Sequence, residues 1–126
     1  MTTASIALQH YRVSLNNGRQ QFFADEPKTV GGTDTAPAPA ELLEAALASC
    51  TAITLRMYAD RKQWNVETID VSVHLSRENG KTIFIKNIGV RGNLTETEKQ
   101  RLLEIAKNCP VSKTLLGEVE INESIQ

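Results

Sequence analysis

The longest apolar segment of the chain is residues 41–62, ELLEAALASCTAITLRMYADRK. It contains no glycine or proline, Pro39 just before it suits a first helical turn, and the glutamates near its start favour the positive end of a helix dipole. We therefore predict that the longest helix of the protein runs from Pro39 to about Arg61. Its apolar stripe on a helical wheel consists of Leu43, Leu47, Cys50, Thr54 and Met57. Cys50 is thus expected to be a packed or interfacial thiol.

The segments before this helix predict a hairpin followed by a loop. Residues 5–8 and 19–24 alternate apolar and polar side chains, and residues 16–18, Asn-Asn-Gly, have the chemistry of a hairpin turn. Residues 25–39 hold three of the four prolines and two adjacent glycines. This composition is typical of a loop.

A second hairpin is predicted after the long helix. Residues 68–75 and 82–89 alternate in the same way and are joined by Glu-Asn-Gly at residues 78–80. We expect one face of this hairpin to be buried.

The remaining segments predict two helices and a final strand. Thr95 and Glu98 have the spacing of a capping box, and the helix that they start is expected to stop at Asn108. The residues of this helix expected in the core are Leu102, Leu103, Ile105 and Ala106. A short helix over residues 110–116 and a last strand over residues 118–121 then complete the chain.

Composition limits the class of protein. With 126 residues, 40% of them hydrophobic, the chain has enough apolar material for one core, so we expect residues 1–126 to form a single domain. The net charge of −1 is spread over mixed acidic and basic residues, so neither nucleic acid nor a membrane surface is an expected partner. The N-terminus lacks a signal-peptide pattern, and no membrane span is expected. We therefore expect a soluble cytoplasmic protein, in which cysteines are inert thiols or form a transient catalytic disulfide.

The two cysteines, Cys50 and Cys109, are the minimum set for repeated thiol redox turnover, because a sulfenic acid needs a second thiol to resolve it. Pro110 suits the first position of the short helix, which places Cys109 at the N-cap, where free N–H groups favour a thiolate. Lys113 lies on the next turn. Cys109 is therefore predicted to be the more acidic thiol. The alternatives are a weakly reactive capping residue at Cys109 and a small core hydrophobe at Cys50; their sequence spacing does not tell whether they meet in space.

Other ligand chemistry finds little support in the sequence. His10 and His74 are isolated among predicted strand residues, without a cysteine or carboxylate at metal-ligand spacing. Gly31 and Gly32 lack the lysine and the spacing of nucleotide-binding loops. We expect neither a metal nor another cofactor.

Ordered blocks along nearly the whole chain carry a family resemblance. They are GGTD at 31–34, PAPAELL at 37–43, SCT at 49–51, TLRMYADRK at 54–62 and CPVSKTL at 109–115. A cysteine in the long helix and a later Cys-Pro-Val segment, in this order, form a specific pattern. By these blocks the chain resembles the OsmC/Ohr family, and most closely its OsmC-like branch.

The resemblance implies an α+β fold of the OsmC/Ohr kind, in which long central helices pack on antiparallel sheets and two chains intertwine as a homodimer. It implies that Cys50 is the peroxidatic thiolate and that Cys109 resolves its sulfenic acid as an intramolecular disulfide. The implied substrates are organic hydroperoxides, with hydrogen peroxide as a further candidate, and the implied reductant is a dithiol such as a lipoyl group. Neither metal nor haem is needed. Ser112 stands where related sequences often carry histidine.

The resemblance also implies a cation beside Cys50. In the family's peroxidases an arginine from an early loop, held by a glutamate near the start of the central helix, takes this place, and the nearest candidates here are Arg19 and Glu41. Arg56 and Arg61 are alternative cations. Two functional alternatives stay open: a noncatalytic dimer that binds a small hydrophobic or thiol-containing ligand, and a redox sensor that uses the same disulfide without rapid turnover.

Overall fold

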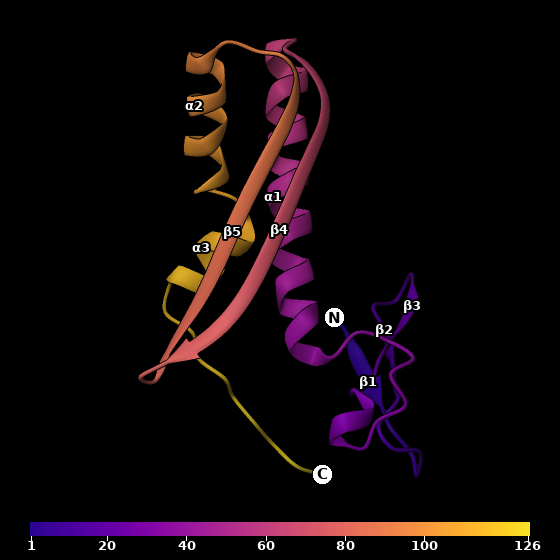
Figure 1. Cartoon of the computed structure of the whole chain (residues 1–126). Coiled ribbons are helices and arrows are strands. Elements are labelled where there is room, and N and C mark those ends of the chain that lie inside the picture. Colours follow the sequence, from indigo (N-terminus) through magenta and orange to yellow (C-terminus); the bar gives the residue numbers. More distant parts are fainter. The chain divides into compact units, whose positions relative to one another are not determined.

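The computed structural model describes all 126 residues of the chain, in two compact units. The first unit is Met1–Leu43 and the second is Glu44–Gln126. The long helix α1 (Pro39–Lys62) starts in the first unit and continues into the second (Figure 1). Its bounds confirm the predicted helix. Each unit has its own sheet, and the single domain expected over residues 1–126 stays a prediction.

The first unit contains a three-stranded antiparallel sheet. Its strands are β1 (Thr3–Ser5), β2 (Val13–Asn16) and β3 (Gln21–Ala24), in the order β1-β2-β3. The turn between β2 and β3 includes Asn17 and Gly18, as predicted, and Gly18 has a φ of 90°, which favours glycine. The first strand of this hairpin was predicted at residues 5–8, and this was wrong. A tight turn pairs the residues that directly flank it, so residues 13–16 take that position.

Asp25 organises the loop that follows β3. Its side chain is buried and accepts hydrogen bonds from the backbone N–H groups of Glu26, Thr33 and Thr35 and from both threonine hydroxyls. The Thr33 hydroxyl has the largest effect, and together these donors hold the pKa of the Asp25 carboxyl well below its ordinary value although burial raises it. The loop includes a short 3₁₀ helix, η1 (Lys28–Val30). The predicted loop is therefore an ordered one.

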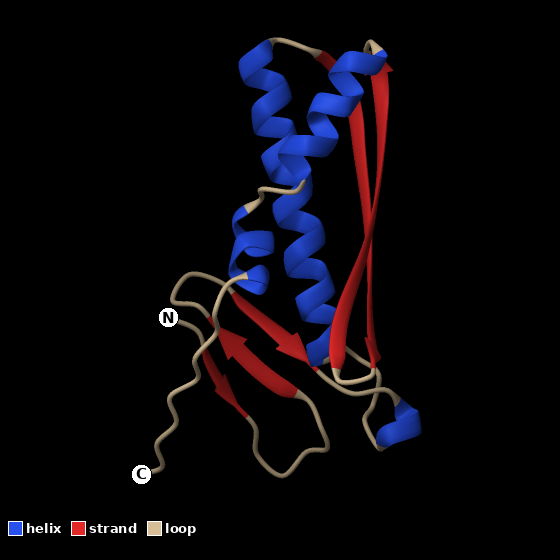
Figure 2. Cartoon of the chain, turned by 90° about the vertical axis from the view of Figure 1, so that its left-hand side faces the viewer, coloured by secondary structure: helices blue, strands red, loops and turns tan.

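The second unit contains a long two-stranded antiparallel hairpin. Its strands are β4 (Asn65–Glu78) and β5 (Lys81–Asn93), which extend beyond the ranges expected from sequence. Asn79 and Gly80 form the turn with φ values of 52° and 76°, the left-handed conformation of a type I′ turn. The predicted turn is confirmed. Figure 2 shows the hairpin running along one side of the helices of this unit.

The core of the second unit lies between α1, the hairpin and α2 (Glu96–Ala106). Its centre is Leu55 of α1 with Leu102 and Ala106 of α2, each at most 1% exposed. The partly buried residues packed against it are Tyr58, Trp64, Ile69, Ile88, Val90, Leu94 and Ile105. These contacts hold both helices on the same face of the hairpin.

The predicted capping box at the start of α2 is confirmed. The Thr95 hydroxyl accepts from the Glu98 backbone N–H at 3.2 Å, and the Glu98 carboxylate accepts from the Thr95 backbone N–H at 2.9 Å. The prediction that Leu103 lies in the core was wrong, since its side chain is 47% exposed. Consecutive helical residues point about 100° apart, so Leu103 turns away from the buried stripe that contains Leu102.

The stripe that α1 buries within the chain is not the predicted one. The buried residues are Leu47, Thr51, Leu55 and Ala59, at steps of four. Leu47 belongs to both stripes, whereas Leu43 and Met57 of the predicted stripe are 46% and 63% exposed within the single chain. The hairpin and α2 pack against a stripe of α1 that lies next to the apolar stripe predicted from the helical wheel. Cys50 consequently lies at the edge of the buried stripe and is half-buried.

The end of the chain agrees with prediction in one part and differs in another. The short helix α3 (Pro110–Leu116) has the predicted bounds, with Cys109 as its N-cap. Residues 118–126 form no strand, so the strand predicted over residues 118–121 was wrong. Alternation of side chains is not enough for a strand, because a strand also needs a neighbouring edge to pair with, and none pairs with this segment.

By length and composition alone, α1 could cross a membrane. Its most apolar 18-residue window has a mean hydropathy of 1.2, and the expectation that the chain has no membrane span stays a prediction. A single helix of this kind is weak evidence for a membrane span, because the core helix of a soluble protein meets the same criteria.

Candidate active site

Cys109 lies at the N-cap of α3 and has no exposed surface. Its Sγ accepts a hydrogen bond from the backbone N–H of Ser112 at 3.4 Å. The hydroxyl of Ser112 lies 3.0 Å from the sulfur, and the hydroxyl of Thr51, from α1, lies 3.5 Å from it. The buried sulfur is therefore surrounded by hydrogen-bonding groups.

The pKa of Cys109 is lowered to about 7. Burial has the largest single effect and raises this pKa, because a thiolate loses its hydration there. The hydrogen bonds from the Ser112 hydroxyl, the Thr51 hydroxyl, the Ser112 backbone and the Cys50 side chain lower it and together outweigh burial. The Cys109 thiol therefore ionises more readily than an ordinary cysteine, whose pKa is about 8.5.

Cys50 approaches Cys109 from the neighbouring helix. It precedes Thr51 on α1, is half-buried, and lies close enough to Cys109 for its side chain to lower the pKa of that thiol by hydrogen bonding. Both thiols are free. Tertiary packing thus brings together one partly exposed and one fully buried cysteine, a pairing that sequence spacing could not show.

Lys86 of β5 reaches the same site, although sequence reasoning did not single it out. Its Nζ donates to the Thr51 hydroxyl at 3.2 Å, to the Ser112 hydroxyl at 3.3 Å and to the carbonyl oxygen of Ala106 at 2.8 Å. One signal was present in the sequence, because Lys86 is two residues before Ile88 and residues two apart in a strand share a face. A lysine on the inward row of a strand indicates a buried acceptor for its ammonium group.

The OsmC-like protein model matches residues 32–124, which is more than half of the chain and includes both cysteines. The chain belongs to the OsmC-like protein family. The family resemblance carried by the sequence blocks is thereby confirmed. No curated protein is found to be a relative of this OsmC-like chain.

Solved structures of OsmC/Ohr proteins share the fold. An OsmC-like protein from Mycoplasma pneumoniae matches with a TM-score of 0.77 and 21% identity, over 93% of this chain and 86% of its own. An organic hydroperoxide resistance protein from Elizabethkingia anophelis matches with a TM-score of 0.68 and 25% identity, over 94% and 89%. An OsmC-like protein of unknown function from Vibrio cholerae matches with a TM-score of 0.72 and 16% identity, over 94% of each chain. The expected α+β fold is confirmed.

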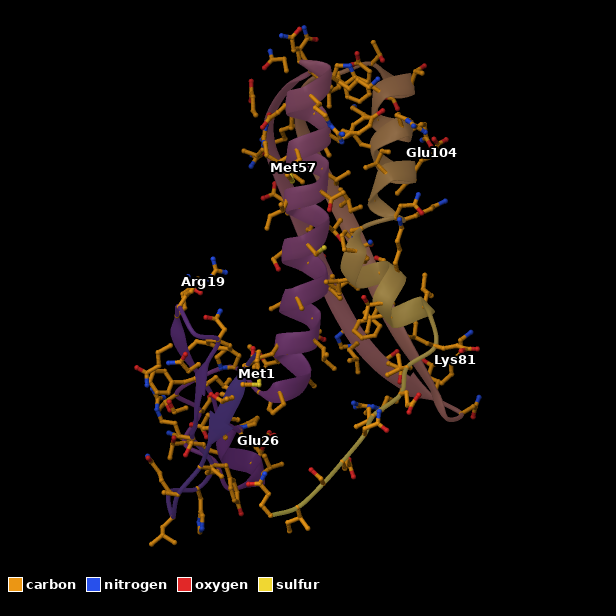
Figure 3. The ribbon with its side chains drawn as sticks, turned by 180° about the vertical axis from the view of Figure 1, so that it is seen from behind. Met1, Arg19, Glu26, Met57, Lys81 and Glu104 are labelled. Carbon is orange, nitrogen blue, oxygen red and sulfur yellow. The ribbon has the colours of Figure 1, made fainter.

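Arg19 and Glu41, the residues suggested by the resemblance as the activating pair, both lie in the first unit of this OsmC-like chain. Arg19 is exposed in the turn between β2 and β3, where its backbone N–H donates to the Asn17 side chain at 3.0 Å (Figure 3). The Glu41 carboxylate accepts from the backbone N–H of Ala38 at 3.3 Å, and so contributes to the start of α1. Their catalytic roles stay predictions.

The alternative arginines have other contacts. The Arg56 guanidinium donates to the carbonyl oxygen of Val66 at 2.8 Å and lies 3.6 Å from the Asp60 carboxylate. The Arg61 guanidinium lies 6.0 Å from the centre of the Tyr58 ring. Within the second unit, Lys86 is the cation that lies one hydroxyl group away from Cys109.

An open groove of about 590 Å³ lies elsewhere in the second unit, between α1 and the hairpin. Its lining residues are Ala48, Ser49 and Ala52 of α1, residues 69–72 of β4 and residues 87–89 of β5. Neither cysteine lines it, so the groove and the thiol site are separate. No group of three or more histidine, cysteine, aspartate or glutamate side chains is arranged to hold a metal ion.

Proposed function

We propose that this OsmC-like protein is a thiol-dependent peroxidase that reduces organic hydroperoxides to alcohols, with hydrogen peroxide as a further substrate. The observation that carries the proposal is the contact between half-buried Cys50 and buried Cys109, whose pKa is lowered to about 7. A neighbouring thiol pair can turn over through a disulfide without metal or haem. Family membership and the hydroperoxide resistance protein among the structural neighbours support the substrate class.

In the proposed reaction Cys50 attacks first, because its partial exposure gives a peroxide access that buried Cys109 lacks. The Cys50 thiolate attacks one peroxide oxygen, the O–O bond breaks, and the departing alkoxide takes a proton to become the alcohol. The Cys109 thiolate then attacks the sulfenic sulfur, forms the Cys50–Cys109 disulfide and displaces hydroxide, which is protonated to water. An external dithiol, such as a lipoyl group, reduces the disulfide.

Two further parts of the proposal extend the family resemblance. Arg19, with Glu41 as its carboxylate partner, stabilises the Cys50 thiolate and the departing alkoxide. The functional form is an intertwined homodimer in the cytoplasm. Exposed apolar side chains on α1 support a second copy as their cover, since Ile53 is 59% and Met57 63% exposed in the single chain.

A noncatalytic binding protein is the second candidate, favoured by the open groove. Its volume of about 590 Å³ falls within the range of small-molecule sites. Alanine, isoleucine and valine side chains in its lining suit a small hydrophobic or thiol-containing ligand. A redox sensor would share the thiol chemistry of the peroxidase and would lack rapid turnover.

The deciding experiment titrates the reduced protein with cumene hydroperoxide and, separately, with hydrogen peroxide, following thiols and disulfides by mass spectrometry. We expect rapid stoichiometric loss of both thiols and a Cys50–Cys109 disulfide. Cys109→Ala should stop at a Cys50 sulfenic acid, whereas Cys50→Ala should stay reduced. Repeated turnover with a dithiol separates a peroxidase from a sensor. If both thiols stayed reduced at modest peroxide excess, the peroxidase proposal would fail and ligand binding in the groove would lead.

A further inference from the structure

Lys86 is linked to the Cys109 sulfur through two hydroxyl groups. Its Nζ lies 3.2 Å from the Thr51 hydroxyl oxygen and 3.3 Å from that of Ser112, and the same two oxygens lie 3.5 Å and 3.0 Å from Sγ. A lysine ammonium only donates hydrogen bonds, so both hydroxyl oxygens accept from it. The carbonyl oxygen of Ala106 accepts a third bond at 2.8 Å and holds the ammonium in place.

The hydrogen bonds from Lys86 leave the hydroxyl hydrogen of Ser112 available to the Cys109 sulfur. Because the Ser112 oxygen accepts from Lys86, its own hydroxyl hydrogen is free to donate to Sγ, and the Ser112 backbone N–H donates there as well. Thr51 divides its single hydroxyl hydrogen between Sγ and the carbonyl oxygen of Leu47 at 2.8 Å, so Ser112 is the main relay. Two donors and a nearby positive charge favour a thiolate, because a charged sulfur accepts hydrogen bonds more strongly than a thiol and is attracted by the ammonium group.

We propose that Lys86 is a positioning residue that acts through Ser112 and Thr51 to stabilise the Cys109 thiolate. The titratable groups that face Cys109 in the second unit are Lys86 from β5 and Cys50 from α1. On α2 the carbonyl oxygen of Ala106 accepts from the Lys86 ammonium group, and on α3 the side chain of Lys113 is exposed. Lys86 is therefore the cation that sets the charge of this site.

Lys86 should also speed the reduction of the Cys50–Cys109 disulfide, a consequence that rests on the proposed function. Cys109 is buried, so the thiolate of an external dithiol attacks the half-buried sulfur of Cys50. A bond forms between the dithiol and Cys50, the Cys50–Cys109 bond breaks, and its electron pair leaves on Cys109 as a thiolate. The second thiol of the dithiol then forms a cyclic disulfide and releases Cys50. A thiol of lower pKa leaves faster, so Lys86 accelerates the first of these exchanges.

The first test measures the pKa of Cys109 from the ultraviolet absorbance of its thiolate, which needs no reagent to reach the buried sulfur. Cys50→Ser is the common background and leaves one thiol. Adding Lys86→Met should raise the pKa by about one unit or more, whereas Lys86→Arg should keep it close to the parent value. The matched control is Lys81→Met, the same change at the exposed start of β5 near the hairpin turn (Figure 3). An unchanged pKa in folded Lys86→Met would overturn the proposal.

The second test measures how fast dithiothreitol reduces the disulfide in proteins oxidised beforehand with diamide. Lys86→Met should be reduced several-fold more slowly than wild type and Lys81→Met, because its leaving thiol has a higher pKa. Diamide oxidation does not depend on peroxidase activity, so the two proposals can fail separately. If Lys86→Met shows both effects but wild type ignores cumene hydroperoxide, only the peroxidase proposal falls. If wild type turns over peroxide and Lys86→Met shows neither effect, only the role of Lys86 falls.

Discussion

At the scale of single residues, the chemistry of the site depends on how each sulfur is surrounded. The predicted N-cap position of Cys109 is confirmed, because the Ser112 N–H donates to the sulfur, and the pKa of this thiol is lowered to about 7. The lysine expected nearby, Lys113, is exposed. The cation that contacts the site is Lys86, which is far from Cys109 in sequence. A helix cap depends on neighbouring residues and can be predicted from the sequence. A cation that another element brings to the site cannot be predicted in this way.

The lowered pKa of Cys109 should make the stability of the reduced protein depend on pH. Because the folded-state pKa of about 7 lies below the usual unfolded value near 8.5, the unfolded chain binds more protons between these values. This contribution is therefore fully present above the unfolded pKa and is lost as pH falls through about 7. We expect the stability difference between wild type and Cys109→Ser to grow by about 2 kcal/mol between about pH 6 and pH 9.5.

Urea unfolding of the two reduced proteins at both pH values measures this difference. The comparison with Cys109→Ser cancels the contributions of titrating groups that lie away from the site, because both proteins share them. A difference that is the same at both pH values would show that Cys109 is not ionised more easily in the folded chain.

At the scale of elements, the buried face of each helix depends on the strands and helices that pack against it. Both helices were located correctly from sequence, but α1 buries Leu55 and Ala59 and leaves Met57 exposed, and α2 buries Leu102 and leaves Leu103 exposed. Periodicity restricts the buried face to a stripe. The orientation of that stripe depends on where the hairpin and the other helix lie, and this is a property of the assembled unit.

Leu102 and Leu103 offer a matched pair for testing this assignment. They are neighbours on α2, and their side chains are 1% and 47% exposed. Leu102→Ala should cost about 2–5 kcal/mol of unfolding free energy, because it removes buried contacts and leaves a cavity. Leu103→Ala should cost much less, since its side chain contributes less to the core. Thermal and urea unfolding of the two variants checks the prediction, and equal costs would contradict the observed face of α2.

At the scale of the whole molecule, apolar surface remains that neither unit covers. Only 28% of the most apolar window of α1 is buried within the chain, and the C-terminal segment exposes Val119, Ile121 and Ile125 without pairing to a strand. Exposed apolar side chains in this number on α1 are typical of an interaction site. A second copy of the chain is the cover that we propose.

We expect the wild-type protein to be a dimer in sedimentation at micromolar concentration and Met57→Glu to dissociate. A charge placed in an apolar interface without a partner should weaken association by about 3 kcal/mol or more, which is at least about a hundredfold in Kd. Leu103→Glu places the same charge on an exposed residue of α2 and serves as the control. A monomeric wild type, or a dimer that Met57→Glu leaves intact, would contradict an interface on this face of α1.

The sequence by itself determined the helices, the second hairpin and the family. The long helix, the Asn79-Gly80 turn, the Thr95 capping box and the Cys109 cap all depend on interactions between residues close together in the chain, and all are confirmed. Ordered sequence blocks sufficed for the family, and the matching OsmC-like model confirms it.

Only the tertiary structure decided the site. How distant elements pack decides that Cys50 lies next to Cys109 and that Lys86 of β5 reaches the same site. It also decides which face of α1 is buried and leaves the predicted last strand without a pairing partner. The periodicity of a segment predicts how side chains are arranged around that helix or strand. It does not predict which other elements contact a thiol, because their positions depend on the tertiary fold. Cys109 as a thiolate therefore depends on its own helix, which supplies the Ser112 N–H and hydroxyl, and, as we propose, on Lys86 from β5.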